Sequence, residues 1–509
     1  QATAFSCAGP LIRPSATFSP EGEEGTRLMR RSVRKAIIEP MTSDANSPDV
    51  TSTPSISTAG RYLIVVVAFL GWAFAGVHMS IVSIVMRVAV ADLLPAGTQE
   101  GVIGQWFGWL VCAFLFGAAT GGYIFGLVGD RVGRARAMAA SILCYSVFSG
   151  LTYFSTSAEM LLVLRFLTCM GIGGMWPNGI ALIAEAWPNV SRPILAGVMG
   201  TAANVGILCF AILTTYRYVT ADDWRWTLLV GASPVLLGLL ALFCVPESPK
   251  WLALRDGTDA GDAAPRVGLG EIFKPPILKT TIMGILLGTI PLFGGWGVSN
   301  WAQAWASEVG DRQVVAEEAN AGSPGPPATD AEQPKSDPGL KSRGAIARSL
   351  TGSITSLLGG AIAAMIGRKL SYGILCACAL ACTQFLFRID DPASKEAFFS
   401  LNLGFVVWEP SEFIFWMASL GFFSGFFFGW LPLCLPELFP TRVRATGAGV
   451  SFNWGRILTG IGVLVSAALL REKFEGRYAD VGQITGFIYA VGIVVILLAP
   501  VTSGKELED

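Results

Sequence analysis

Three ionisable side chains lie inside long apolar stretches of this sequence. His78 stands in GWAFAGVHMS, Arg165 in LLVLRFLTC and Arg456 in SFNWGRILTG. A charged group in such surroundings costs about 2.5–3.5 kcal/mol unless it faces a cavity or a partner. An arginine fork there matches a carboxylate in bidentate geometry, and a histidine can exchange a proton near neutral pH. The chemistry indicated is recognition of an organic anion, with His78 as a candidate proton carrier.

Each of these three side chains also has a structural interpretation. His78, the single histidine of the chain, can be a neutral imidazole that is hydrogen-bonded between two helices. Arg165 can be a strut near the end of its helix. Arg456 can pair with backbone carbonyls or with Glu412. Sequence alone leaves both interpretations open.

Aromatic rings and amides gather in the stretch GGWGVSNWAQAW. Trp301 and Trp305 are one helical turn apart, and the outer Trp305 is expected to anchor at the membrane interface. The deeper side chains combine aromatic faces with amides, which suits a planar or hydroxylated organic solute. The candidate solute-binding residues are His78, Arg165, Asn178, Trp296, Asn300, Gln303, Asn453 and Arg456.

The elements that hold these residues are predicted to be membrane helices. Hydrophobic residues make up 52% of the chain and charged residues 14%, whereas a soluble protein has about a quarter of its residues charged. A bilayer core requires about twenty apolar residues in helical form. Twelve runs of this kind are predicted, at 62–84, 102–128, 136–156, 159–184, 194–216, 226–245, 277–301, 345–366, 370–388, 413–435, 446–470 and 482–502.

Polar segments divide these twelve runs into two sets of six. The segment PESPKWLALRDGTDAGDAAPRVGLGEIFKPP separates the sixth run from the seventh, and AGSPGPPATDAEQPKSDPG has the composition of a flexible loop. The N-terminal region is rich in Ser, Pro and Thr, and Met41 can be its true initiator. The predicted organisation is a disordered tail (1–60), a six-helix bundle (61–246), a central cytoplasmic loop (247–276), a second six-helix bundle (277–502) with a flexible loop (307–342), and a short C-terminal tail (503–509).

Two short motifs occur at matching positions in the two sets. EAWPNVSR follows the fourth run and ELFPTRVR follows the tenth, and both have Glu, Pro and Arg at the same spacing. Gly126 precedes Gly133 by seven residues in the loop after the second run, and Gly360 precedes Gly367 by seven after the eighth. The two sets are therefore predicted to share one fold.

These loop residues resemble a family signature. Gly126, Asp130, Arg131, Gly133 and Arg134 stand in the pattern G-x-x-x-D-R-x-G-R, which resembles the loop signature of the major facilitator superfamily. PESPKWL and PELFPTRVRATG add a resemblance to its sugar porter, sialate and organic-acid carrier branches, over roughly residues 60 to 502. The resemblance implies an all-α membrane protein with twelve transmembrane helices as two six-helix pseudo-repeats, a solute site between them, and cytoplasmic termini.

The loop charges are candidates for a conformational latch. Arg131 and Arg134 can pair with carboxylates such as Glu185, and such pairs can hold in one state and break in the other. Because Ala364 stands where Asp130 does, the second latch is expected to be weaker. The alternative is that the charges anchor the helices and set topology. The candidate latch residues are Gly126, Asp130, Arg131, Gly133, Arg134, Glu185, Arg192, Gly367, Arg368, Glu437 and Arg444.

Several classes of protein are disfavoured. A formal net charge of −1 gives no basic surface for nucleic acid. The sequence has no Walker-type phosphate loop, no metal-ligand spacing and no catalytic triad that sequence can support. All cysteines except Cys7 lie in apolar segments, where thiols pack as small hydrophobes. We expect no enzymatic activity, no cofactor and no metal, and a monomer in the lipid bilayer.

The predicted function is secondary transport. The expected cargo is a small organic anion, of monocarboxylate or sugar-acid type, moved by alternating access together with protons. Related carriers often bear an Asp shortly after Gly-Trp in the first helix, where this chain has Ala75, so the usual carboxylate for proton coupling is missing. The alternatives are a carrier of neutral sugars or polyols, and a nutrient sensor that keeps the fold without transport.

Overall fold

A computed structural model describes residues 56–187, 192–255, 269–321, 337, 339–402, 404, 407–440 and 443–500. Most of the predicted N-terminal tail with Met41, and the C-terminal tail at 503–509, lie outside these residues. The described part is almost entirely helical.

The first six predicted spans each coincide with a helix or a pair of helices. Two of the helices begin with a serine cap: the hydroxyl oxygens of Ser57 and Ser157 accept hydrogen bonds from the backbone N–H groups of Gly60 (3.1 Å) and Met160 (3.2 Å). Pro234, which has no N–H, divides the sixth span in two. The helices are α2 (Thr58–Leu93), α3 (Glu100–Val132), α4 (Arg134–Thr152), α5 (Ala158–Ala186), α6 (Arg192–Tyr216), α7 (Trp226–Ala232) and α8 (Val235–Cys244).

The second six spans repeat this pattern after a connecting segment that holds α9 (Pro249–Arg255) and a 3₁₀ turn, η1 (Leu269–Phe273). The seventh span is a helix interrupted by one π-helical turn, and the twelfth is divided at Phe487. The elements are α10 (Ile277–Phe293), η2 (Gly294–Val298), α11 (Ser299–Ala321), α12 (Leu340–Ile366), α13 (Arg368–Leu386), α14 (Glu412–Glu437), α15 (Arg444–Glu472), α16 (Tyr478–Gly486) and α17 (Ile488–Leu498).

The predicted all-α membrane architecture is confirmed, since ten helical segments of the described residues are long and apolar enough to cross a bilayer. The predicted spans 136–156 and 345–366 coincide with α4 and α12, which are less apolar. Several of the exposed apolar side chains lie on α8 and α17, as expected of surfaces that face lipid. They include Leu236, Phe243, Leu497 and Leu498.

Three of the predicted loops contain regular structure. The flexible loop predicted at 307–342 starts too early, because α11 continues to Ala321 and α12 begins at Leu340. The sequence SEVGDRQVVAEEANA has few helix breakers, so the helix extends beyond its apolar part. The central loop at 247–276 contains α9 and η1, and a short hairpin, β1 (Leu401–Asn402) with β2 (Val407–Trp408), lies between α13 and α14.

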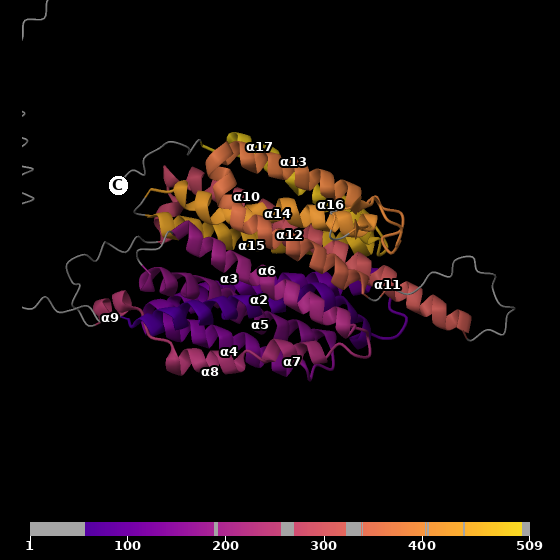
Figure 1. Ribbon diagram of the computed structural model, residues 1–509, viewed down its shortest axis with the longest axis horizontal. Helices are drawn as coiled ribbons and strands as arrows, with labels where there is room; N and C mark the ends of the chain where they lie inside the picture. Colours follow the sequence, from indigo (N-terminus) through magenta and orange to yellow (C-terminus); the bar gives the residue numbers. More distant parts are fainter. Residues whose placement is uncertain are drawn as a thin grey trace, which may run out of the picture. The chain divides into compact units, whose positions relative to one another are not determined.

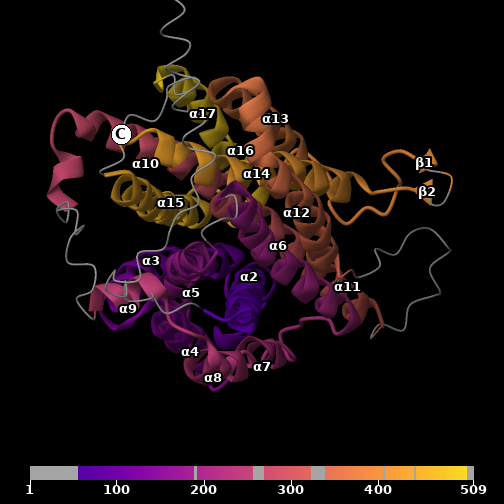
Figure 2. The same ribbon diagram turned by 60° about the vertical axis from the view of Figure 1, so that its left-hand side comes forward.

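The same pairs of helices pack in both halves. In the first half α3 packs on α5, α4 on α5 and α8, and α2 on α6; in the second half the corresponding pairs are α12 with α14, α13 with α14 and α17, and α10 with α15. Across the halves α3 packs on α15 and α6 on α12, which are also corresponding pairs (Figure 1). Figure 2 shows α8 and α17 on the outer sides of the two halves. The predicted duplication of six-helix units is thus confirmed.

Glycines with the same backbone geometry join two corresponding pairs of helices. Gly133, between α3 and α4, has φ 118° and ψ 151°; Gly367, between α12 and α13, has φ 93° and ψ 146°. Residues with side chains rarely adopt these angles. A side chain at Gly133 would also overlap the carboxylate of Glu247, whereas the space at Gly367 is open.

We predict unequal losses of stability from the two alanine substitutions. Gly367→Ala introduces backbone strain of about 1–3 kcal/mol, and Gly133→Ala adds displacement of Glu247 to a similar strain. The thermal unfolding midpoints of the two purified variants in detergent should therefore order as wild type, Gly367→Ala, Gly133→Ala. Equal midpoints for the variants would contradict the role given to Glu247.

Candidate functional site

A cavity of about 590 Å³ lies between the two halves. Its walls come from α2, α3, α5 and α6 of the first half and from α10, η2, α11, α12, α14 and α15 of the second. This volume is in the range of about 300–1,000 Å³ that is typical of small-molecule sites. The cavity is therefore large enough for an organic solute with one aromatic ring.

Aromatic side chains from both halves form much of the wall. Trp72 on α2 packs against Trp176 on α5 with ring centroids 4.8 Å apart, and Phe114 on α3 packs against Trp296 at 4.1 Å. Trp296 lies on the π-helical turn η2; such turns are frequent at functional sites. The arrangement offers flat apolar faces to a planar solute.

Arg456 on α15 lines this cavity, as predicted. Its guanidinium lies over the ring of Phe452, 4.8 Å from the centroid, and Nη1 donates to Asn453 Oδ1 at 3.4 Å. The proposed pairing with Glu412 is not formed among the described residues; Glu412 accepts a hydrogen bond from Trp416 Nε1 instead, at 3.3 Å. Arg456 is thus held in the wall by neutral neighbours.

Arg348 on α12 also lines the cavity, although it is not among the solute-binding residues predicted from the sequence. Its Nε is buried without a hydrogen-bond partner. The sequence contained the evidence for this role, because Arg348 falls inside the predicted span 345–366. The free-energy cost of a charge within a membrane span applies to Arg348 as much as to Arg456. Arg348 and Arg456 are the two ionisable side chains among the described residues of the wall.

Four of the eight predicted solute-binding residues line the cavity: Trp296, Gln303, Asn453 and Arg456. Asn300 lies just behind the wall, where its Oδ1 accepts a hydrogen bond of 2.6 Å from the cavity residue Ser83.

Asn178 is instead a structural residue. Its amide nitrogen donates to the carbonyls of Phe125 (3.0 Å) and Gly174 (2.8 Å), which ties α5 to α3. The prediction that Asn178 contacts solute is not supported by this position, because the amide donors are already used.

His78 and Arg165 lie together in the core of the first half, outside the described cavity wall. His78 Nε2 donates to Gly231 O at 3.0 Å, and its ring packs edge-on against Tyr145. Arg165 Nη2 donates to the backbone carbonyl of His78 at 3.3 Å. Both side chains are at most 1% exposed. Both residues were predicted to bind solute because the sequence indicates how deep a residue lies in the membrane. It does not indicate the direction in which the side chain points.

We predict that His78→Phe lowers stability and leaves proton dependence unchanged. The substitution keeps the ring against Tyr145 but leaves the Gly231 carbonyl without its donor, at a cost of about 1–3 kcal/mol. The measurements are the thermal unfolding midpoint and the stimulation of solute uptake by a pH gradient. A variant with wild-type stability and no gradient stimulation would instead make His78 a proton carrier.

One end of the cavity is closed by polar contacts between the halves, which we call the sealed end. Glu100 on α3 accepts hydrogen bonds from Arg87 of the same half, at 3.0 and 2.8 Å, and from Tyr478 of the other half at 2.6 Å. Arg87 also donates to Ser307 across the halves at 3.4 Å. Lys341, 2% exposed, donates to the carbonyl of Val219 at 3.0 Å.

At the opposite end, the hydrogen bonds that the described loop residues make stay within one half. Arg134 pairs with Asp130 one turn away, at 2.5 Å, and Arg131 is exposed. Glu185 accepts from Ser248 rather than from an arginine. The predicted pair between an arginine and Glu185 is therefore not formed in this structure. The Glu185 carboxylate is bound instead by Ser248, in the segment that follows α8.

The residues of PESPKWL bind the ends of three helices of the first half. Glu247 accepts from the backbone N–H of Ala135 at 2.9 Å, at the start of α4, where a carboxylate is favoured. Trp251 Nε1 donates to the carbonyl of Asp130 at 3.0 Å. This segment fixes the loop that carries the family signature.

The second half has a direct ion pair at the corresponding place. Arg368 donates to both carboxylate oxygens of Glu437, at 3.0 and 2.9 Å, and both residues belong to the second half. The expectation that the second latch is weaker stays a prediction. The side chains of Arg192 and Arg444 lie outside the described residues, and Gly126 has open space around it.

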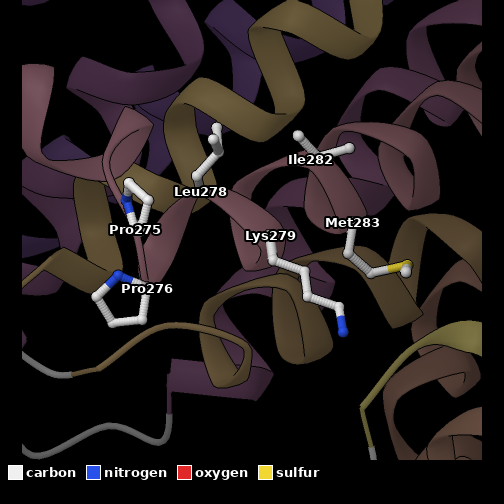
Figure 3. A pocket seen from close by; sticks show the side chains of 6 residues that line it. All are labelled: Pro275, Pro276, Leu278, Lys279, Ile282 and Met283. Carbon is white, nitrogen blue, oxygen red and sulfur yellow. The ribbon is translucent and has the colours of Figure 1, made fainter.

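A second hollow, of about 340 Å³, lies at the start of α10 and is unrelated to the central cavity (Figure 3). Its walls come from Pro275, Pro276, Leu278, Lys279, Ile282 and Met283, which all belong to one short segment. Ile282 is 48% exposed. A hollow with walls from a single helix start has no converging polar groups, and we do not assign it a ligand.

Residues 56–266 match the family model described as sugar (and other) transporter. Among solved structures, the xylose transporter XylE from E. coli, in a partially occluded inward open conformation, has a TM-score of 0.62 at 17% identity, covering 88% of this chain and 100% of that one. These similarities support a transporter of the major facilitator superfamily. The matched proteins are membrane transporters and not enzymes, and the ten apolar helices among the described residues indicate an integral membrane protein.

Curated relatives of this chain include a niacin transporter and a 4-hydroxybenzoate transporter. The niacin transporter NiaP of Acinetobacter baylyi is 24% identical over 88% of this chain and 96% of its own length. The 4-hydroxybenzoate transporter PcaK of Pseudomonas aeruginosa is 31% identical over 38% of this chain and 45% of its own length.

Proposed function

We propose that this transporter carries a small organic anion of the aromatic carboxylate class by alternating access, together with a proton. The observation that carries the proposal is the charge of the cavity: the ionisable side chains among its described wall residues are two arginines. An uncompensated guanidinium in low-dielectric surroundings favours a carboxylate ligand. The flat walls formed by Trp72, Trp176, Phe114 and Trp296 suit an aromatic ring.

Two curated relatives support the aromatic class, since the substrates after which they are named, niacin and 4-hydroxybenzoate, are single-ring aromatic molecules. The sealed end and the likeness to an inward open structure support a cavity that opens toward the cytoplasm. With that orientation both termini of this transporter are cytoplasmic.

Transport of a neutral sugar is the second candidate. The matched family model and the xylose transporter structure favour it, and the amides of Gln303 and Asn453 in the cavity wall can bind hydroxyl groups. The two arginines count against it, because a neutral solute leaves both charges uncompensated.

An uptake panel separates these functions. Purified protein in proteoliposomes is offered radiolabelled nicotinate, 4-hydroxybenzoate, glucuronate and xylose, with and without an inwardly directed proton gradient. We expect uptake of the aromatic acids above protein-free liposomes, and stimulation by the gradient. Uptake of xylose without the acids would overturn the anion assignment, and acid uptake that ignores the gradient would remove the proton.

A further inference from the structure

The side chain of Arg348 differs from those of Arg87, Arg368 and Lys341 in having no acceptor. Arg87 and Arg368 each hold a carboxylate by two hydrogen bonds, and Lys341 donates to the carbonyl of Val219. The side chain of Arg348 makes neither a hydrogen bond nor an ion pair among the described residues, and its Nε is buried without a partner. Because an unmatched buried donor is costly, a structural role alone does not explain this side chain.

Because Arg348 lines the cavity, a solute bound there can supply the acceptor that its side chain lacks. The residue lies on α12 and Arg456 lies on α15, and both guanidinium-bearing side chains line the same space. Two like charges that share a low-dielectric cavity repel each other. Glu412, the carboxylate proposed from sequence as a partner for Arg456, is engaged by Trp416. A solute with one negative group compensates one of these charges and leaves the other.

The walls restrict what can lie between the two arginines. Trp296 on η2 and Phe452 on α15 belong to the same wall, and Phe452 is already stacked under Arg456. A single aromatic ring fits a cavity of about 590 Å³, and substituents on opposite sides of such a ring point in opposite directions. An aromatic ring with an acidic group at each end therefore fits the volume of the cavity and matches the charge of its wall.

We infer that Arg348 is a second anion-binding side chain of the cavity, and that the preferred solute is an aromatic acid with a second negative group across the ring. The inference rests on the proposed function and narrows its substrate class. Arg456 binds one carboxylate in this arrangement and Arg348 binds the other.

Terephthalate and benzoate test this inference, because they share the ring and differ in the second carboxylate. Binding to purified protein in nanodiscs is measured calorimetrically for wild type, Arg348→Gln and Arg348→Lys. We expect wild type to bind terephthalate about tenfold more tightly than benzoate. Arg348→Gln should remove this preference while its affinity for benzoate stays within about threefold of wild type, and Arg348→Lys should keep part of the preference.

Arg343→Gln is the matched control. Arg343 is on the same helix but pairs with Asp337 away from the cavity wall, and its side chain is 45% exposed. It should bind both acids as wild type does. Equal binding of the two acids by wild type, or an equal loss of both in Arg348→Gln, would overturn the second site. If wild type binds neither acid nor any member of the uptake panel, the proposed function fails with it.

Discussion

Arg456→Ala is expected to remove organic-anion uptake. The substitution deletes a guanidinium that lies in the cavity wall over Phe452 and that the described structure pairs with no carboxylate. A hydrogen bond to a charged group contributes about 1.5–3 kcal/mol, so the loss of one or two such bonds weakens binding by about 10- to 100-fold or more. Initial uptake rates in proteoliposomes measure the effect at a solute concentration below the wild-type KM.

Two further variants make this result specific. Arg456→Lys keeps the charge but loses the planar fork, so partial uptake is expected. Arg388→Ala removes an exposed arginine that follows α13, and uptake should be unchanged. Wild-type uptake by Arg456→Ala, in protein that elutes as a single species, would exclude Arg456 from the solute site.

Glu100→Gln is expected to shift the transporter toward a state that is open at the sealed end. Glu100 holds Arg87, which is 4% exposed, and also binds Tyr478 of the other half at 2.6 Å. The substitution weakens the hydrogen bond from Tyr478 and releases Arg87, which donates to Ser307 of the other half, and each hydrogen bond to a charged group contributes about 1.5–3 kcal/mol. A bias of about 5.5 kcal/mol converts a population ratio of 1:99 into 99:1, so the expected change in conformational population is on the order of a hundredfold.

Spin-label distances report this opening directly. Labels are placed at Gln99 and Lys473, which are exposed residues of the two halves at the sealed end, after the exposed Cys209 and Cys244 are replaced by serine. Glu100→Gln should lengthen the distance between the labels. An unchanged distance distribution would show that this network does not hold the two halves together.

Two substitutions control for the Glu100 result. Tyr478→Phe removes only the contact between the halves and should give a smaller shift in the same direction. Asp223→Asn breaks an ion pair with Arg217 in which both side chains are about half exposed, and exposed pairs contribute about 0–1 kcal/mol. This variant should not change the label distance.

The fold could be predicted from the sequence because its signals are local and repeated. Each span is an apolar run of helical length, and polar segments mark the ends of most runs. The equal spacing of motifs after the fourth and tenth helices predicted the duplication, and Gly133 and Gly367 now show the same backbone geometry. The helix ends were less accurate: α11 continues to Ala321 because its polar continuation still favours a helix.

The site could be predicted only in part, because a continuous apolar run does not show which face of its helix points toward the cavity. Arg456 and Trp296 were placed in the cavity correctly, whereas Arg165 turns into the core of its own half and donates to His78 O. Arg348 was missed although the same criterion applied to it. The cluster at the sealed end includes Arg87 and Lys341, which lie outside the predicted spans 62–84 and 345–366 and were not considered as membrane charges.

The two halves contribute different kinds of residue to the cavity wall, and this difference determines how the transporter responds to membrane voltage. Both cationic wall residues, Arg348 and Arg456, belong to the second half, while the first half contributes Trp72 and Trp176. The charge of the loaded cavity therefore differs from that of the empty one: the proposed doubly negative solute cancels the two wall charges and leaves only the accompanying proton, whereas the empty cavity keeps both charges. Moving one elementary charge across the whole membrane changes its electrical energy by about 2.3 kcal/mol per 100 mV. Membrane voltage therefore acts mainly on the steps of the transport cycle in which the cavity is empty.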